Sequence, residues 1–279
     1  MITDIPTGND FEKIAAEYKH NLALKSDGSL VGWGYNGYGL IDDIPTGNDF
    51  VDIEVGHYHS LALKSDGSLV GWGCNDYGLI DDIPIGNDFV KIAASYGHDL
   101  ALKSDGSLIG WGYYNDYGQI DDIPTGYDFI DIAIGCYHSL ALKDDGSLVG
   151  WGRISTVPEG NDFVKIAVNN SSSLALKSDG SLIGWGRIDD VIDGNDFVDI
   201  AAAAFNDLAL KSDGSLICWG DNTYNLSDVP EGNNFVDIAV GHSYCLALQG
   251  TPEPVPEPAT CLLLIFGFLG IAGIKKKFY

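Results

Sequence analysis

The chain has 279 residues, 40 of them acidic and 15 basic, and a formal net charge of −25. This length suits one large or two small domains with an ample core. So acidic a body repels nucleic acid phosphates and anionic membrane surfaces, which argues against nucleic acid as a partner. The five cysteines form no C-x-x-C pair, so neither a disulfide framework nor a zinc site is predicted.

Internal repeats fill residues 1–250. The string LALKSDGSLVGWG begins at Leu22 and again at Leu61, and four near-copies follow. The tryptophans that close these copies are 39, 39, 40, 34 and 34 residues apart, which sets the length of one unit. A second piece, such as GNDFVDIEVGHYHS around Phe50, precedes each copy. It occurs a seventh time around Phe235, where no GWG follows.

Each unit is predicted to form three short strands. Residues 50–55 alternate apolar and acidic side chains, the period of a half-buried strand. Residues 61–64 continue as a second strand, and residues 65–67, Ser-Asp-Gly, form a tight hairpin because Asp and Gly tolerate positive φ. Residues 68–73 form the third strand, whose glycines beside Trp72 allow close approach of a neighbouring backbone.

A three-stranded unit cannot bury both of its faces alone. Units stacked radially cover each other's faces and leave only short edges, which favours a β-propeller. A linear β-solenoid is the alternative, but its coils are usually shorter than these units. We therefore predict an all-β fold, a β-propeller of about seven blades with three short strands per blade, the seventh incomplete, over residues 1–250.

The stretch GHYHSLALKSDGSLVGWGCNDYG, residues 56–78, resembles the repeat of the regulator of chromosome condensation family, above all its short bacterial form. The resemblance covers roughly residues 5–250. It implies a seven-bladed propeller with about three strands per blade. The family's functions differ widely, since the eukaryotic founder is a nucleotide-exchange factor that binds chromatin and one bacterial member is a secreted inhibitor of β-lactamases. The acidic body and the lack of long insertions between units argue against the founder's activity.

No residue in the repeats is predicted to be catalytic or to bind a metal or cofactor. Histidines occupy one position in four units, but Ser172, Asn206 and Tyr244 take that position later, so we predict a hydrogen-bonding role at a strand end. The repeated tryptophans and turn aspartates are expected to be structural. The chain has no G-x-S-x-G, phosphate-loop or H-E-x-x-H motif. The histidines are His20, His59, His98 and His138.

The loops after each GWG are the candidate binding loops. They should emerge on one face of the ring and bring their tyrosines and asparagines together there. Tyrosine offers a flat apolar ring and a hydroxyl, which together with amides suits sugars or protein surfaces. The alternative is that N-x-x-G is simply how these units turn. The candidate partner-binding residues are Tyr35, Tyr38, Tyr77, Tyr113, Tyr117 and Tyr224, with Asn36, Asn75, Asn115 and Asn222.

The tail differs in composition from the repeats. Residues 251–258 hold four prolines, which predicts an extended spacer. Residues 259–274 carry no charge and are followed by three lysines, so we predict a C-terminal hydrophobic helix there. As a helix, this run would span roughly 24 Å, against about 30 Å for a bilayer core. The lysines should stay cytoplasmic, leaving the propeller on the far side of the membrane. A buried core helix is the alternative.

The tail resembles the PEP-CTERM sorting signal of Gram-negative bacteria. The motif is carried by Pro256, Glu257 and Pro258, the membrane segment by Leu262 to Ile274, and the basic end by Lys275, Lys276 and Lys277. The resemblance makes residues 259–279 a membrane and sorting segment. It implies export, transient residence in the inner membrane through residues 259–274, processing by an exosortase-type enzyme, and release to the cell surface or an exopolysaccharide matrix.

Export normally needs a signal peptide, yet MITDIPTGNDF has neither a basic region nor an apolar run. The seventh unit also lacks its third strand. Both observations predict residues ahead of Met1 that carry a signal peptide and a GSLxGWG-like strand. A stop codon immediately upstream and in frame would contradict this expectation.

These observations together predict an exported, non-enzymatic propeller at the cell surface or in the exopolysaccharide matrix that binds a protein or a polysaccharide. One alternative is a secreted enzyme inhibitor, and another is a polysaccharide-active propeller enzyme. Acidic residues confined to one blade and clustered in the central channel would favour an enzyme. The acidic residues here mostly recur in every unit, which favours a scaffold.

Overall fold

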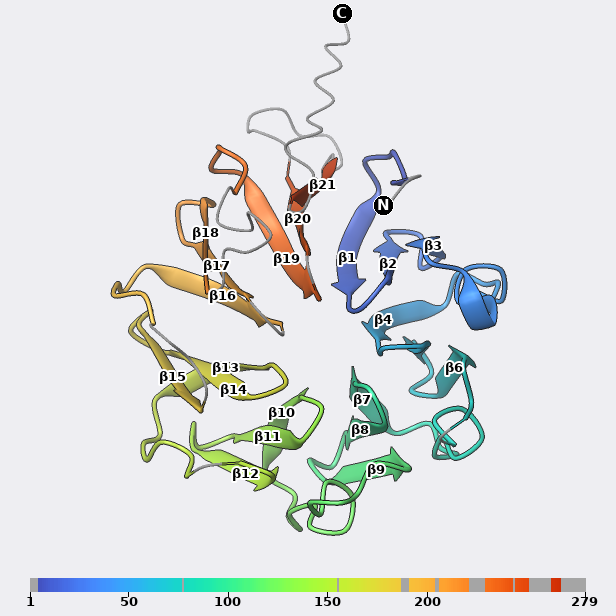
Figure 1. Cartoon of the computed structure of the whole chain (residues 1–279), viewed down its shortest axis with the longest axis horizontal. Coiled ribbons are helices and arrows are strands. Elements are labelled where there is room, and N and C mark those ends of the chain that lie inside the picture. Colours follow the sequence, from blue (N-terminus) through green and yellow to red (C-terminus); the bar gives the residue numbers. More distant parts are fainter. Residues whose placement is uncertain are drawn as a thin grey trace, which may run out of the picture.

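The computed structural model describes residues 5–76, 78–154, 156–186, 191–203, 206–220, 229–242, 244–250 and 262–266. These residues form seven antiparallel sheets of three consecutive strands each. The sheets stand in a ring in chain order (Figure 1), and we number them as blades one to seven. The fold is therefore the all-β repeat propeller that the sequence predicts.

The strands keep the same lengths from blade to blade except β19, which is one residue longer, and a short 3-10 turn, η1 (Gly37–Gly39), follows β3. The first strands are β1 (Phe11–Ala16), β4 (Phe50–Val55), β7 (Phe89–Ala94), β10 (Phe129–Ile134), β13 (Phe163–Val168), β16 (Phe197–Ala202) and β19 (Phe235–Gly241). The second strands are β2 (His20–Lys25), β5 (His59–Lys64), β8 (His98–Lys103), β11 (His138–Lys143), β14 (Ser172–Lys177), β17 (Asn206–Lys211) and β20 (Tyr244–Gln249). The third strands are β3 (Leu30–Gly34), β6 (Leu69–Gly73), β9 (Leu108–Gly112), β12 (Leu148–Gly152), β15 (Leu182–Gly186), β18 (Leu216–Gly220) and β21 (Leu262–Phe266).

The second strand of each blade is buried on both faces. In β5 every residue except Lys64 is buried, and successive side chains point to opposite faces of the sheet. Leu61 and Leu63 therefore pack against one neighbouring blade, whereas the small Ala62 packs against the other. This pattern explains why LALK recurs almost unchanged.

The hydrophobic core is divided into clusters that lie between blades. One cluster joins Leu22 and Leu24 of blade one to Phe50, Ile53 and Trp72 of blade two. Equivalent clusters occupy the boundaries that follow. Each blade thus receives its apolar cover from the next, as expected for quasi-one-dimensional repeats bent into a ring.

Blade seven packs against blade one, which closes the ring. Phe11 and Trp33 of blade one share a cluster with Leu246 of blade seven. The backbone N–H of Ile14 donates to Asp237 Oδ2 at 3.0 Å. The ring is therefore closed by contacts between two separate sheets, since each sheet contains strands of one blade alone.

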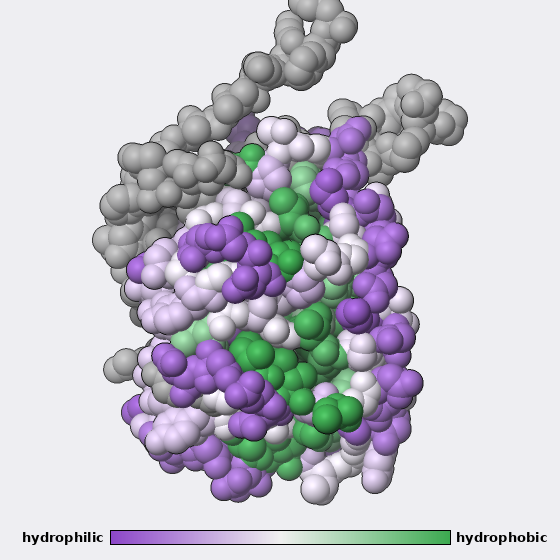
Figure 2. All heavy atoms as spheres, turned by 90° about the vertical axis from the view of Figure 1, so that its right-hand side faces the viewer, coloured by the Kyte–Doolittle hydropathy of each residue, from purple (hydrophilic) through white to green (hydrophobic). Residues whose placement is uncertain are grey.

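The outer wall of the ring carries an apolar band. Figure 2 shows the side on which blades one to three lie in Figure 1, with apolar residues gathered in the middle of the wall between polar margins. The third strands β3, β6 and β9 belong to this side and are only half-buried apart from their tryptophans. The third strands therefore form the edge of each sheet, as the predicted strand order requires.

The glycines beside the tryptophans permit close backbone approach, as predicted. Gly73 has φ +109°, and a Cβ there would come within 2.7 Å of the Tyr58 carbonyl oxygen and 2.8 Å of His59 Cα. In the Ser-Asp-Gly turn, Gly67 has φ +81°, and a Cβ would lie 2.3 Å from the Asn87 carbonyl oxygen of the next unit. The turn aspartate is structural too, because Asp66 Oδ1 accepts from the backbone N–H of Ser68 at 2.9 Å.

The repeated histidines form a hydrogen-bonded belt between blades. Each reaches the second residue of the next blade's second strand, which confirms their predicted role at a strand end. Burial lowers the pKa of His20 to about 3 and those of His98 and His138 to about 4, so these rings are neutral at neutral pH. The bonds join His20 Nε2 to Ser60 Oγ at 2.8 Å, His59 Nε2 to Asp99 Oδ2 at 2.9 Å, His98 Nε2 to Ser139 Oγ at 3.2 Å and His138 Nε2 to Ser173 Oγ at 2.8 Å. At ring closure, the Tyr244 hydroxyl donates to Asn21 Oδ1 at 2.7 Å.

The belt is interrupted after blade five, where the histidine is replaced by the shorter Ser172. The belt residue of blade six is Asp207, and its buried Oδ1 has no hydrogen-bond partner among the described residues. Burial raises the pKa of Asp207 to about 7 and outweighs a side-chain hydrogen bond with Asn169 of blade five, which acts to lower it. Burial of the carboxyl group therefore favours its neutral form.

The tryptophans depend on the loop of the preceding blade. The indole N–H groups of Trp72, Trp111 and Trp151 donate to the carbonyl oxygens of Leu40, Leu79 and Gln119 at 3.0, 3.1 and 2.9 Å. These acceptors lie in the long loops after β3, β6 and β9. After blades four and five the loops are shorter, and the indole N–H groups of Trp185 and Trp219 are buried without a partner in the described structure. The indole N–H of Trp33, which faces blade seven, is also unpaired there.

Blade seven corrects two expectations. Leu262–Phe266 form strand β21, which pairs antiparallel with β20, so these residues are not part of a hydrophobic helix and the seventh sheet has three strands. Phe266 pairs with Cys245 in the register in which Trp33 pairs with Asn21. The reason is physical: a short run of Leu, Ile and Phe suits a strand as well as a helix, and β20 offers unpaired backbone groups at its open edge.

The remaining predictions for the tail lie outside the described residues, including Pro256, Glu257 and Pro258 and Lys275, Lys276 and Lys277. Within the described ranges, no helix has both the length and the apolar character needed to cross a bilayer.

We predict that Trp72→Phe costs about 1 kcal/mol more stability than Trp33→Phe. Both side chains are buried, at 5% and 3% exposure, so the lost apolar area is matched. Trp72→Phe leaves the Leu40 carbonyl without its donor, whereas Trp33→Phe removes an N–H that has no acceptor in the described structure. Urea unfolding followed by circular dichroism measures the difference, and equal losses would contradict the assigned bond.

We predict that Asp207→Asn stabilises the protein at neutral pH but not near pH 4. The folded-state pKa, about 7, lies above the ordinary value of 3.8. As pH rises, the unfolded chain therefore loses its proton first, and the free energy of unfolding falls until pH reaches the folded-state pKa. Asparagine removes this loss, which amounts to about 1 to 4 kcal/mol. Unfolding curves between pH 4 and pH 8 test this prediction. If the free energy of unfolding depends on pH in the variant as it does in the wild type, the raised pKa does not belong to Asp207.

Candidate functional site

The two ends of the ring present different chemistry. In each blade the first strand pairs with the second so that Phe11 lies opposite Lys25 and Ala16 opposite Asn21. The Ser-Asp-Gly turns and the G-N-D segments therefore share one end, which we call the turn face. The turns between first and second strands and the loops after each third strand share the other end, which we call the loop face. The arrowheads of β1, β4, β16 and β19 point toward the middle of the ring, so these turns lie near its centre (Figure 1).

The candidate asparagines hold the loops together. Asn36 Oδ1 accepts from the backbone N–H groups of Ile41 and Asp42 at 2.9 and 3.1 Å. Asn75 and Asn115 make the same pair of bonds in the next two blades. Their carbonyl oxygens are therefore used within the loop, as the turning role of N-x-x-G requires. Asn222 lies outside the described residues.

The candidate tyrosines that the structure describes are exposed on the loop face. Tyr38 and Tyr113 have 57% and 73% of their surface exposed, and Tyr35 and Tyr117 have 45% and 42%. The ring of Tyr38 lies 5.8 Å from that of Tyr58, and the ring of Tyr117 lies 6.0 Å from that of Tyr137. The loops after the third strands therefore contact the turns near the centre of the ring through their tyrosine side chains. Tyr77 and Tyr224 lie outside the described residues.

A continuous row of aromatic rings crosses the loop face from blade seven to blade four. Tyr18 stacks on His57 at 4.1 Å between ring centroids, and His57 contacts Tyr96 at 5.1 Å. Tyr96 contacts Tyr114 at 6.3 Å, and Tyr114 contacts Tyr137 at 6.1 Å. These separations are typical of attractive stacked and edge-to-face pairs. We call this row the aromatic arc: His242, Tyr18, His57, Tyr58, Tyr96, Tyr114 and Tyr137.

None of the seven arc residues is among the candidates that the sequence predicts. Tyr18, Tyr58, Tyr96 and Tyr137 belong to the turns between first and second strands, whereas the candidates were sought in the loops after the third strands. A signal was present, because an aromatic residue stands one or two positions before the belt histidine in each of the first four units.

The arc carries positive charges that are not neutralised. In the described part of the chain, Lys19 and Arg153 are the basic residues without an ion pair. The Lys19 ammonium lies 4.5 Å from the ring centroid of Tyr18, and the Arg153 guanidinium lies 5.3 Å from that of Tyr117 and 6.0 Å from that of Tyr137. The other described lysines pair with carboxylates: Lys13 with Asp52, Lys25 with Asp10, Lys64 with Asp49, Lys91 with Asp131, Lys103 with Asp88, Lys143 with Asp128, Lys165 with Asp199, Lys177 with Asp162 and Lys211 with Asp196.

One carboxylate lies within the arc. Glu17 Oε1 is 3.4 Å from His57 Nδ1, and the backbone carbonyl of Glu17 accepts from the N–H of His242 at 3.1 Å. Glu17 thus links the arc residues of blades one, two and seven. Its position makes that end of the arc a structural junction, and leaves the unpaired cations to either side of it.

A pocket of about 910 Å³ opens at the far end of the arc, between blades four and five. Tyr137 and Arg153 stand on one side, Asn170 and Ser171 on the other, and Trp185 also lines it. The Sγ–H of Cys136 donates to Asn170 Oδ1 at 2.9 Å, which orients that amide. The pocket therefore combines aromatic surface with a guanidinium and small polar groups.

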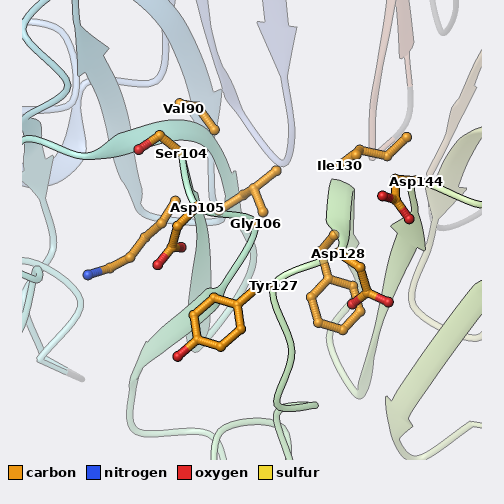
Figure 3. A pocket seen from close by; sticks show the side chains of 11 residues that line it. Val90, Ser104, Asp105, Gly106, Tyr127, Asp128, Ile130 and Asp144 are labelled. Atoms are coloured by element: carbon orange, nitrogen blue, oxygen red, sulfur yellow. The ribbon is translucent and has the colours of Figure 1, made fainter.

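The turn face has a smaller hollow of about 420 Å³ between blades three and four (Figure 3). Val90 and Ile130 line it with Asp105, Tyr127 and Asp128. Two of its carboxylates already have partners, since Asp105 accepts from Ser107 and Asp128 pairs with Lys143. The same turn recurs in the other units, so this hollow is built largely from the framework of the fold.

Among the described residues, no group of three His, Cys, Asp or Glu side chains converges as a metal site. The belt histidines face serine or aspartate partners in the next blade.

The ring of seven sheets and the repeated three-stranded unit define the class of this protein, a seven-bladed β-propeller. Residues 11–40, 50–79, 89–119 and 129–153 match the model of the regulator of chromosome condensation (RCC1) repeat. These four segments, in blades one to four, are therefore similar to the RCC1 repeat. Among curated proteins, none matches the sequence.

Solved structures with this fold come from several eukaryotes. The ectodomain of the Physcomitrella patens receptor kinase CR4 aligns with a TM-score of 0.76 and 20% identity, over 94% of this chain and 74% of that one. Yeast RCC1 (Prp20), solved bound to Kap60, aligns with a TM-score of 0.67 and 19% identity over 83% and 78%. Prp20p from Saccharomyces cerevisiae, studied with Gsp1p and histones, aligns with a TM-score of 0.65 and 20% identity over 79% and 74%. These likenesses establish the propeller fold.

Proposed function

We propose that this propeller is a non-enzymatic binding module of the cell surface or exopolysaccharide matrix, and that its loop face binds polysaccharide. The aromatic arc is the observation that carries the proposal. Its rings touch one another across five blades, and exposed tyrosines of the neighbouring loops extend it. A row of this kind offers a long ligand repeated apolar surface edged with hydroxyl groups.

The shape of the arc favours a chain-like ligand. Isolated exposed tyrosines are common on protein surfaces, but a connected row follows a path along which successive sugar rings can bind. Tyrosine loses little conformational entropy on binding, because it has only two side-chain torsions. Ring-to-ring contacts within the arc restrict those torsions before a ligand arrives, which lowers the cost of binding further.

Export and sorting form the second part of the proposal. The tail contains, in this order, a proline-rich spacer with Pro256–Glu257–Pro258, an apolar run and Lys275–Lys277. This order supports a PEP-CTERM-type signal that an exosortase-type enzyme recognises in a Gram-negative bacterium. The inner membrane would then be a transient location before release. A polysaccharide matrix is also the setting in which an aromatic binding face would find its ligand.

A protein partner is the second candidate, either bound at the surface or inhibited as a secreted enzyme. The structural neighbour Prp20 supports it, since it was solved bound to the protein Kap60. The loop face could serve such a partner because tyrosine-rich surfaces also suit protein interfaces.

We predict that Tyr58→Ala and Tyr137→Ala each weaken polysaccharide binding about tenfold, because each change removes one ring of the arc from the surface that contacts the ligand. Tyr127→Ala is the matched control, since Tyr127 is a 76% exposed tyrosine on the turn face. A glycan array followed by calorimetry on the full chain provides the measurement. Equal effects of all three changes would place binding elsewhere, and no glycan binding by the wild type would favour a protein partner.

We predict that replacing Pro256, Glu257 and Pro258 by alanine keeps the exported protein in the membrane fraction, whereas the wild type is released. The test expresses the chain behind an export signal in a Gram-negative host that has an exosortase. The sequence supplies its own control, because residues 252–254 form a second Pro-Glu-Pro. Alanine there should leave release unchanged, and release of both variants would refute the sorting role.

A further inference from the structure

We infer that the pocket beside Trp185 binds the carboxylate of an acidic sugar residue, so that the polysaccharide held by the loop face is a polyuronate. The inference rests on the proposed function for the ligand class, and adds the charge of the ligand and the residue that selects it.

The pocket exists because a loop is short. In blades two to four, the loop of the preceding blade places a carbonyl oxygen over the tryptophan indole, as Gln119 does for Trp151. The chain after Gly152 starts as in the earlier blades, with the N–H of Arg153 donating to the Tyr137 carbonyl at 2.8 Å, and then turns away, with the N–H of Ile154 donating to the Gly152 carbonyl at 2.9 Å. Trp185 therefore lacks the cover that the earlier tryptophans have, and its N–H finds no acceptor in the described structure.

Arg153 supplies the charge. It follows β12 directly, and its guanidinium lies against the rings of Tyr117 and Tyr137, so its position is fixed by stacking. It has no carboxylate partner among the described residues. The net charge of −25 repels anions from most of the surface, so an arginine held at a pocket without a carboxylate partner is the local group that can attract one.

The described lining of the pocket matches a carboxylated ring. It includes no acidic side chain, and it offers the aromatic surfaces of Tyr137 and Trp185 for the ring of a sugar. Asn170 and Ser171 supply hydrogen-bonding groups opposite Arg153. A guanidinium binds a planar carboxylate through two parallel hydrogen bonds, a geometry that selects it over a neutral hydroxymethyl group.

The pocket also continues the arc, because Tyr137 belongs to both. A chain lying along the arc would therefore bring one of its residues to Arg153. This continuity distinguishes the pocket from the hollow on the turn face, which lies on the opposite face of the ring from the arc.

The test measures the affinities of the full chain for oligogalacturonate and for a neutral glucan of equal length by calorimetry at two salt concentrations. We expect oligogalacturonate to bind about tenfold more tightly than the neutral glucan, and Arg153→Gln to remove most of that difference in affinity. Arg153→Lys keeps the charge but loses the two-bond geometry. Its affinity ratio should therefore lie between those of the wild type and Arg153→Gln. Lys143→Gln, which removes the same charge from the turn face, should leave the ratio unchanged.

The outcomes separate the two proposals. If neither glycan binds, the proposed function fails. If both bind equally, or if Lys143→Gln lowers the ratio as much as Arg153→Gln, the acidic-sugar site is wrong while the glycan-binding face stands. The carboxylate assignment would be overturned if a sulfated glycan bound as tightly as oligogalacturonate and Arg153→Lys left both affinities unchanged, because that result would show general attraction of anions.

Discussion

Every other feature of this molecule depends on how its sheets bury their two faces. A blade of three strands has apolar residues on both sides, such as Leu61 on one and Ala62 on the other, and it obtains cover only from its neighbours. The clusters between blades make the boundaries apolar, and the belt of hydrogen bonds makes those from blade one to blade five directional as well. Closing the ring between blades one and seven supplies the last boundary and fixes the loops on one face.

Most of the fold could be predicted from the sequence because the same structural signals recur in each repeat. Local geometry is specified by the alternation in residues 50–55, by the Ser-Asp-Gly turn and by the glycines at Trp72. Six copies of these features predict the same three-stranded unit. The fate of residues 262–266 could not be predicted, since a short apolar run is compatible with helix and strand, and only the open edge of β20 distinguishes them.

The aromatic residues of the loop face were predicted only in part. Loop tyrosines such as Tyr38 and Tyr117 were recognisable because their loops vary between units, whereas Tyr18 and Tyr96 lie in turns that look like framework. Which rings touch depends on the curvature of the ring and on the spacing between blades, and no pattern in the sequence encodes those directly. The asparagines had a local role that their N-x-x-G setting already suggested.

The dependence of each tryptophan on the loop of the blade before it has a consequence for how such proteins diversify. A change in loop length within one unit alters the surface of the next unit without touching any strand or any apolar boundary. Trp151 and Trp185 are 34 residues apart rather than 39 or 40, and that shortening opens a pocket one blade downstream. In this architecture a new ligand specificity can therefore arise by deletion, at little cost to the core.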